Sequence, residues 1–248
     1  MKKNGFSRPF DKYQILTWIL FTILASSFYF VYIPLTPSQL FPIISIPYTL
    51  SSCLVCYFTF RVCSCNPADP SLLSDTKTLT KSSKTCTVCK SDVFLSSKHC
   101  GSCDKCISGF DHHCRALNTC IGFKNYLNFF RLLKCVEIWL LLQLVTELYC
   151  LTKISELFQA KCGLLIFLLI EGILILVLLL ANGGLLIFHC WLKKNSISTY
   201  DFVVKKYYRS VAPSMGDGKK SEERYIIKSS NTPIGHPYSV SQDQLTNL

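Results

Sequence analysis

The chain has 248 residues, of which 50% are hydrophobic and 17% are charged, and its mean hydropathy is +0.32. Soluble proteins carry about a quarter charged residues, so an ordinary soluble enzyme is disfavoured, and the many Leu, Ile, Val and Phe residues exclude disorder throughout. The 26 Lys and Arg against 15 Asp and Glu give a net charge of +11. On so apolar a chain, this excess is more typical of a membrane protein's cytosolic face than of nucleic-acid binding.

Residues 13–60 contain no charged side chain and cover roughly twice the ~20 apolar residues of one helical span. Pro34 and Pro37 near their middle predict a turn, because proline fixes φ and removes a backbone donor. We therefore predict two transmembrane helices, near residues 15–32 and 41–60. A cleaved signal peptide is the alternative for the first, but the apolar run is longer than usual and no A-x-A site follows, which favours a retained anchor.

The rest of the chain alternates between polar and apolar segments. A polar, basic stretch begins at Arg61, and two further apolar segments follow at about residues 132–151 and 162–192. They contain Glu137, Glu147 and Glu171, of which the first two are expected at solvated or hydrogen-bonded positions and Glu171 is a functional candidate. The predicted order is a cytosolic N-terminus, two transmembrane helices, a cytosolic cysteine-rich domain, two transmembrane helices and a cytosolic tail with a disordered distal part, at residues 1–14, 15–60, 61–130, 131–192 and 193–248.

The orientation follows from the distribution of basic residues. The turn within residues 13–60 has none, and the link between the third and fourth apolar segments has only Lys153 and Lys161. Most other Lys and Arg residues lie in the N-terminus, the cysteine-rich stretch and the tail, which the positive-inside rule places in the cytosol. The sequence thus predicts an α-helical polytopic membrane protein with four spans and both termini cytosolic.

Seven of the fifteen cysteines gather between residues 86 and 120 of the polar insert, together with three histidines. The cytosol is reducing, so clustered cysteines there indicate metal binding or catalysis rather than disulfides. Pairs of cysteines two residues apart let both thiolates reach one tetrahedral zinc ion around a tight turn. The order along the chain is Cys86-x2-Cys89, His99-Cys100-x2-Cys103-x2-Cys106, Asp111-His112-His113-Cys114 and Cys120.

The number of ligands indicates more than metal binding. Two closed tetrahedral sites need eight ligands, whereas residues 86–120 offer seven sulfurs and three imidazoles. If each site takes three cysteines and one histidine, one cysteine and one histidine are left beside Asp111. A cysteine, a histidine and an aspartate are the parts of an activated thiolate nucleophile.

This frame, with Asp111-His112-His113-Cys114 at its centre, resembles the DHHC family of zinc-finger protein S-acyltransferases (palmitoyltransferases). The similarity extends to an Asp-Pro element after the second span, at Asn66-Pro67-Ala68-Asp69-Pro70, and to Asn125 and Phe129 after the last cysteine. It also includes Ser198-Thr199-Tyr200-Asp201, a conservative version of the family's Thr-Thr-x-Glu element.

The resemblance implies a set of site residues and a reaction. Cys114 would be the nucleophile, His112 its proton acceptor and Asp111 the group that orients the imidazole. Cys114 would take a palmitoyl group from palmitoyl-CoA and pass it to cysteines of substrate proteins at an endomembrane: endoplasmic reticulum, Golgi or endosome. The cysteine-rich domain would consist of short β-hairpins around two structural Zn²⁺ ions, one bound by Cys86, Cys89, His99 and Cys106 and the other by Cys100, Cys103, His113 and Cys120.

One departure from the family pattern bears on activity. Arg115-Ala116 stands where most members have a pair ending in Trp, which packs against the start of the acyl chain. The alternative function is therefore a weakly active or inactive membrane adaptor of the same family. Lys124, Arg131 and Lys134 are candidates for pairing with CoA phosphates, although a role as positive-inside flanking residues is favoured.

Overall fold

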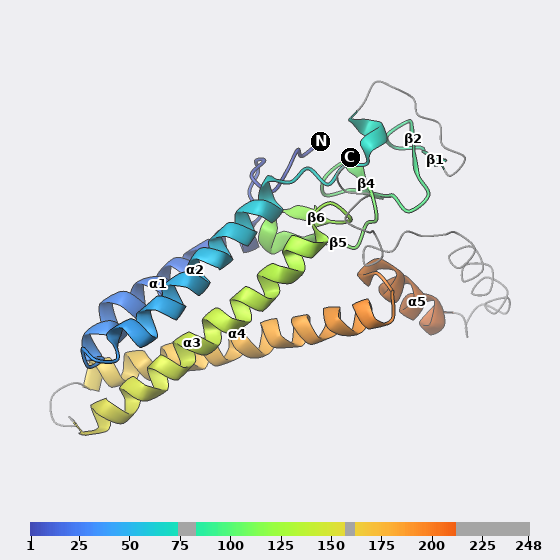
Figure 1. Cartoon of the computed structure of the whole chain (residues 1–248). Helices are drawn as coiled ribbons and strands as arrows, with labels where there is room; N and C mark the ends of the chain where they lie inside the picture. The colour runs from blue at the N-terminus through green and yellow to red at the C-terminus, as the bar shows by residue number, and fades with distance from the viewer. Residues whose placement is uncertain (74–82, 157–161, 212–248) are drawn as a thin grey trace. The chain divides into compact units, whose positions relative to one another are not determined.

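The computed structural model describes residues 1–73, 83–156 and 162–211 (Figure 1). These residues form two compact units that are interleaved along the chain. A helical unit contains Asp11–Val62 and Asn128–His189, and a cysteine-rich unit contains Met1–Phe10, Cys63–Leu127 and the described residues from Cys190 onward. The distal tail, for which the sequence predicts disorder, lies outside the described residues.

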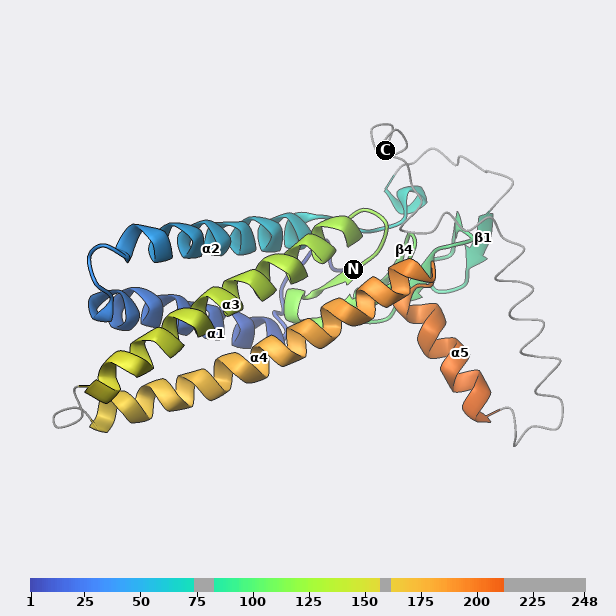
Figure 2. The ribbon, with the colours of Figure 1, turned by 60° about the horizontal axis from the view of Figure 1, so that its bottom comes forward.

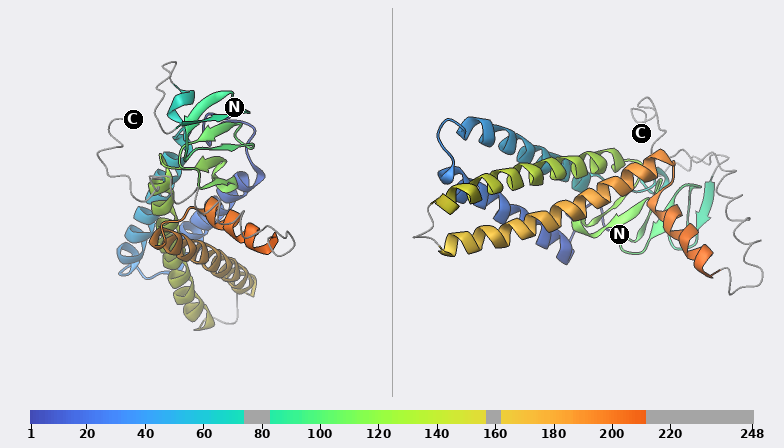
Figure 3. Two further views of the ribbon diagram at one scale, coloured as in Figure 1. Left: turned by 90° about the vertical axis from the view of Figure 1, so that its right-hand side faces the viewer. Right: turned by 90° about the horizontal axis from the view of Figure 1, so that it is seen from below.

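Long helices that lie lengthwise beside one another build the helical unit (Figures 2 and 3). The first begins after Asp11, whose side chain accepts a hydrogen bond from the Tyr13 backbone N–H at 2.9 Å and so caps the helix. It continues through a π turn and a 3-10 turn before the chain reverses. The elements are α1 (Lys12–Ser27), η1 (Phe28–Tyr32), η2 (Ile33–Leu35), α2 (Phe41–Ser64), α3 (Tyr126–Glu156) and α4 (Cys162–Lys194).

Three stretches of the described residues are long and apolar enough to cross a membrane, namely Lys12–Leu35, Phe41–Ser64 and Cys162–Lys194. Helix α3 is 31 residues long but is not among them. Its charged side chains include Arg131, Lys134, Glu137 and Glu147, which lower its apolar character. Composition therefore supports three of the four predicted spans.

Helix α3 nevertheless shares a buried polar core with the three apolar helices, through Gln143. The Gln143 Nε2 donates to the Leu24 carbonyl oxygen at 2.9 Å and to Ser27 Oγ at 3.2 Å, both in α1. The Tyr48 hydroxyl of α2 donates to Gln143 Oε1, and Ser27 Oγ donates to Glu171 of α4. Interhelical hydrogen bonds of this kind hold helices together where surrounding groups are apolar.

Glycines of α4 make room for the glutamates of α3. A Cβ on Gly172 would lie 2.4 Å from Glu147 Oε1, and one on Gly183 would lie 2.9 Å from Glu137 Oε1. Glu137 is hydrogen-bonded as expected, since Asn182 Nδ2 donates to it at 2.7 Å. The solvated position is wrong for Glu147, which is 1% exposed because α4 covers it.

The described residues of the cysteine-rich unit form three antiparallel two-stranded hairpins between α2 and α3, which confirms the predicted β-hairpin region. Each strand has only three or four residues, and isolated hairpins this short are not stable in water. The elements are η3 (Pro70–Leu72), β1 (Ser83–Cys86), β2 (Ser91–Phe94), β3 (Lys98–Cys100), β4 (Lys105–Ile107), β5 (His112–Cys114), η4 (Arg115–Leu117), β6 (Thr119–Ile121) and α5 (Thr199–Val211).

Asp69, in the Asp-Pro element, anchors the first hairpin. Its side chain is fully buried and accepts hydrogen bonds from the Phe94 N–H at 3.0 Å and from the Ser97 hydroxyl. It also accepts one from the Ser71 N–H at 2.9 Å, while its own N–H donates to the Cys106 carbonyl oxygen. A buried carboxylate with this many donors fixes the segment before β1 against β2 and β4.

Candidate metal centres and active site

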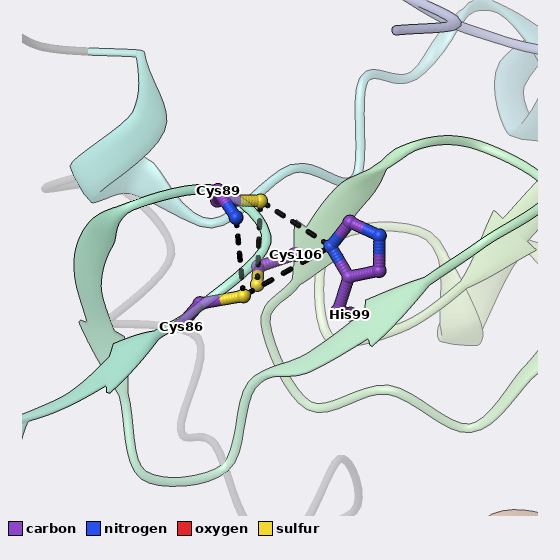
Figure 4. Close-up of side chains that lie close together, drawn as sticks. All are labelled: Cys86, Cys89, His99 and Cys106. Carbon is purple, nitrogen blue, oxygen red and sulfur yellow. Dashed lines mark hydrogen bonds between the residues drawn. The ribbon is translucent and has the colours of Figure 1, made fainter.

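The first cluster consists of Cys86, Cys89, His99 and Cys106, whose ligand atoms all lie within 4.8 Å of one another (Figure 4). Cys89 Sγ is 3.3 Å from His99 Nδ1 and 3.8 Å from Cys106 Sγ. The turn between β1 and β2 carries Cys89, and the Cys89 N–H points to Cys86 Sγ at 3.4 Å. His99 and Cys106 lie opposite each other in the β3–β4 pair, so this cluster joins two hairpins.

The second cluster consists of Cys100, Cys103, His113 and Cys120, whose ligand atoms also all lie within 4.8 Å of one another. His113 Nδ1 lies 3.8, 3.4 and 3.5 Å from the sulfurs of Cys100, Cys103 and Cys120. His113 and Cys120 are partners across β5–β6, while Cys100 ends β3. This cluster therefore joins the second hairpin to the third.

Both clusters fit a tetrahedral zinc ion. Bonds of about 2.3 Å to sulfur and 2.0–2.1 Å to nitrogen place tetrahedral ligand atoms roughly 3.5–3.8 Å apart, close to the distances found in both clusters. Hydrogen bonds with Cys103 and Cys120 lower the pKa of Cys100, whereas hydrogen bonds with Cys100 and Cys103 raise the pKa of Cys120. Ionisation of Cys100 thus disfavours that of Cys120, and a divalent cation would let both become thiolates.

Asn125 supports the second cluster from the start of α3. It is fully buried, and its Nδ2 donates to the Cys120 carbonyl oxygen at 2.9 Å. Its Oδ1 accepts from the Gly122 N–H, also at 2.9 Å. The asparagine that the resemblance singled out thus fixes the backbone of β6 next to Cys120.

The remaining three residues, Asp111, His112 and Cys114, form a hydrogen-bonded series. Asp111 Oδ2 lies 2.7 Å from His112 Nδ1, and the His112 side chain bonds in turn to Cys114. Burial alone would lower the pKa of His112, but its bonds to Asp111 and Cys114 raise it to about 9. Cys114 is half-buried at the end of β5.

Thr199 at the start of α5 holds Asp111. The Thr199 N–H donates to Asp111 Oδ1 at 2.9 Å and its hydroxyl donates to Asp111 Oδ2 at 2.7 Å. Burial would raise the pKa of Asp111, but the bonds from His112 and Thr199 lower it. Asp111 therefore carries a negative charge next to the N-terminus of a helix, where the exposed N–H groups favour an anion.

Sequence reasoning did not assign Thr199 a role at the site. It noted the element Ser198-Thr199-Tyr200-Asp201 only as part of a resemblance. Ser198 and Asp201 cap α5 reciprocally, with Ser198 Oγ donating to Asp201 Oδ2 at 2.7 Å and the Asp201 N–H donating back at 3.0 Å. This capping box is visible in the sequence and predicts where α5 begins, but it does not reveal the partner of Thr199.

The departure from the family pattern lies in the turn η4, next to Cys114. Arg115 is exposed and Ala116 is half-buried. An indole at position 116 would add a large apolar surface to this turn, and the methyl group of Ala116 supplies little of it.

The fold and the clusters define a class of protein: helices long and apolar enough to span a membrane, interrupted by a cysteine-rich region with two groups that could bind metal ions. The model of the DHHC palmitoyltransferase family matches residues 79–206, which is more than half of the chain and includes both clusters. The chain therefore belongs to the DHHC palmitoyltransferase family. A comparison with curated proteins found no match.

Proposed function

We propose that the protein is an S-acyltransferase that moves a palmitoyl group from palmitoyl-CoA, through an acyl-cysteine intermediate on Cys114, to cysteines of substrate proteins. The hydrogen-bonded series Asp111–His112–Cys114, with Asp111 held by Thr199, is the observation that carries this proposal. It supplies a nucleophile, a proton acceptor and an orienting carboxylate in contact with one another.

In the first step, His112 takes the proton from Cys114 Sγ as the sulfur attacks the thioester carbonyl carbon of palmitoyl-CoA. A new bond forms between the acyl carbon and Cys114 Sγ, and the bond from that carbon to the CoA sulfur breaks. His112 gives its proton to the CoA sulfur, so that CoA leaves as the thiol. Asp111 keeps His112 Nδ1 hydrogen-bonded, so that the other ring nitrogen exchanges the proton.

In the second step, the thiol of a substrate cysteine gives its proton to His112 and attacks the acyl carbon on Cys114. The chain moves to the substrate, and Cys114 leaves as a thiolate that His112 reprotonates. The order is ping-pong, because CoA departs before the substrate protein reacts.

Two zinc ions would be held by the two Cys₃His clusters and would supply structure rather than chemistry, because four protein ligands leave no open coordination position. The residues of the clusters crosslink three hairpins that are too short to fold alone. The ligand His113 lies in the same short strand as His112 and Cys114, so the second cluster bears on the geometry of the reacting groups.

We place four helices in the membrane, with the cysteine-rich region and both termini in the cytosol and the protein in an endomembrane. The hydrogen bonds of Gln143 support α3 as a fourth span, because they join this less apolar helix to α1, α2 and α4. A bilayer location suits the reaction, since each buried CH₂ of an acyl chain contributes about 0.8 kcal/mol to partitioning. The polar CoA stays on the cytosolic side.

A membrane adaptor with little or no transferase activity is the second candidate. Arg115 and Ala116 favour it, because they replace the pair whose Trp packs against the acyl chain in most members of the family. In that case the cysteine-rich unit would be a binding surface, and Cys114 would carry no acyl group.

The test uses purified protein incubated with alkyne-tagged palmitoyl-CoA, with hydroxylamine-sensitive label measured on the chain. We expect label on the wild-type protein and on Cys65→Ser, the matched control outside both clusters, and background label on Cys114→Ser. Background label on a wild-type protein that still binds two zinc ions would favour the adaptor. If Ala116→Trp then restored label, the defect would lie in the turn after Cys114.

A further inference from the structure

Residues 2–9, which we call the strap, lie on the cysteine-rich region and bond to its backbone. The Lys2 N–H donates to the carbonyl oxygen of Cys103, a member of the second cluster, at 3.0 Å. The Gly5 N–H donates to the Cys63 carbonyl oxygen at 2.8 Å. The strap is thus attached at two places, at Cys103 of the second cluster and at Cys63 near the end of α2.

The strap also provides partners for a buried cation. Lys105 in β4 is 1% exposed, and its Nζ donates to the Lys3 carbonyl oxygen at 2.9 Å and to Asn66 Oδ1 at 2.7 Å. Buried charged groups require hydrogen-bonding partners. Removing the strap would leave Lys105 with one acceptor fewer, so this contact belongs to the fold of the region.

Asn118 makes the densest contact with the strap. Its side chain is buried, with 1% of the residue exposed, and its Nδ2 faces the carbonyl oxygens of Gly5, Ser7 and Pro9 at 3.3, 3.1 and 3.3 Å. Its Oδ1 accepts from Lys2 Nζ at 2.7 Å. Both ends of the amide are therefore engaged by the strap.

The backbone of Asn118 ends the turn that follows Cys114. Turn η4 covers Arg115–Leu117, and Asn118 closes it with φ 52° and ψ 30°, a left-handed conformation that asparagine tolerates better than most residues. Gly5 of the strap lies against the same turn, since a Cβ on Gly5 would be 2.4 Å from the Leu117 carbonyl oxygen. The strap therefore contacts the turn through both a side-chain amide and a close backbone approach.

We propose that the strap fixes turn η4 and so positions Cys114 for acyl transfer, with Asn118 as the positioning residue. This inference rests on the proposed function. Cys114 is held on one side by its pairing with Thr119 in the β5–β6 hairpin, and on the other by a turn whose end is bonded to the strap. A reacting group displaced by about 1 Å can lose on the order of 100-fold in rate, so this attachment bears on rate more than on binding.

Two substitutions release the strap from opposite sides. Asn118→Gly removes the amide but keeps a residue that adopts the left-handed backbone. Gly5→Ala places a methyl group against the Leu117 carbonyl oxygen and changes no residue of the site. Gly184→Ala is the matched control, because a Cβ at Gly184 has no atom within 4 Å.

The experiment measures the rate constant and KM of Cys114 acylation by palmitoyl-CoA in the full-length protein, with zinc content measured alongside. We expect Asn118→Gly and Gly5→Ala each to lower the rate constant by about tenfold or more, with KM within about twofold of wild type and both zinc ions retained. The double variant should be no slower than the slower single variant, because both changes release one attachment. Wild-type rates in both single variants, or losses that multiply in the double variant, would overturn the proposal.

Amide hydrogen exchange separates failure of this proposal from failure of the proposed function or of folding. Exchange at residues 116–119 should be faster in Asn118→Gly and in Gly5→Ala than in wild type and in Gly184→Ala, whether or not the wild-type protein is acylated. Unchanged exchange there would show that the strap does not fix the turn. Faster exchange together with absent wild-type acylation would reject the transferase function and with it the positioning role.

Discussion

The two Cys₃His clusters differ in burial and in what they hold. In the first cluster, Cys86 and Cys89 are half-buried and come from the end of β1 and from the turn that follows it. In the second, all three cysteines are buried, and they form the small apolar core of the region together with Ile107. The first cluster thus attaches the β1–β2 hairpin, whereas the cysteines of the second are part of a buried apolar core.

The alternation of side chains along a strand explains how the clusters are linked to each other and to the site. Successive residues of a strand point to opposite faces. His99 and Cys100 are neighbours in β3 and therefore serve different clusters. In β5, His112 and Cys114 share one face, while His113 points to the other and joins the second cluster. The second cluster therefore sets the orientation of His112 and Cys114, the pair that we propose reacts, and the first does so only through the β3–β4 hairpin that both clusters share.

The largest effect is expected from Cys103→Ser in the second cluster. Binding of a structural zinc ion contributes about 10–16 kcal/mol, comparable with or above the whole stability of a domain. We expect acyl label to fall to background and zinc content to drop, as measured by metal analysis and alkyne-palmitoyl labelling. Retention of label above one tenth of wild type would contradict the central role of this cluster.

Cys89→Ser in the first cluster should be less damaging. The variant is expected to bind one zinc ion instead of two and to lose on the order of ten- to a hundredfold in acylation rate, because the β3–β4 hairpin keeps Cys100 and Cys103 as ligands of the second cluster. The same two measurements apply. Equal losses in Cys89→Ser and Cys103→Ser would remove the distinction between the clusters.

Thr199→Val should affect the reacting groups without affecting either cluster. It removes the hydroxyl that donates to Asp111 Oδ2 at 2.7 Å, a bond to a charged group worth about 1.5–3 kcal/mol. We expect the acylation rate constant to fall by about tenfold or more with both zinc ions retained. Thr199→Ser keeps the hydroxyl and should stay within about threefold of wild type. A wild-type rate in Thr199→Val would show that Asp111 does not need the Thr199 hydroxyl.

Asp69→Asn should alter stability alone. The amide can accept at one position only, so donors such as the Phe94 N–H and the Ser97 hydroxyl lose a charged acceptor, at a cost of about 1–3 kcal/mol. Thermal release of zinc should occur at a lower temperature, while the acylation rate at low temperature stays within about twofold. Asp92→Asn is the control, since its bond to Thr85 on the same hairpin is exposed. A zinc-release temperature equal to that of the control would show that Asp69 does not anchor the hairpin.

The sequence predicts the cysteine-rich site well because its chemistry is local. The two-residue spacing in Cys86-x2-Cys89 and Cys100-x2-Cys103 already requires tight turns, and the resemblance divides the ligands into the two groups that the structure brings together. The fold is predicted less completely. Helix α3 is not apolar enough by composition, and its place with the other helices depends on buried bonds of Gln143 that no local pattern reveals.

The contacts that support the site are long-range, and for this reason the sequence does not predict them. Thr199 and Asp111 are 88 residues apart, and Lys2 of the strap and Asn118 are 116 residues apart. Thr199 carries a local signal only for the start of α5, and Asn118 carries none for its partners. Such pairs are fixed by tertiary packing, which spacing and composition do not encode.

The most direct test of the account is mass spectrometry of the purified protein after a brief reaction with palmitoyl-CoA, combined with the amount of CoA released. We expect one palmitoyl thioester per chain, on the peptide that contains Cys114, formed in a burst with one equivalent of CoA and with both zinc ions retained. An acyl group on a different cysteine, or absence of any adduct on a zinc-loaded protein, would contradict the assignment of Cys114 as the nucleophile.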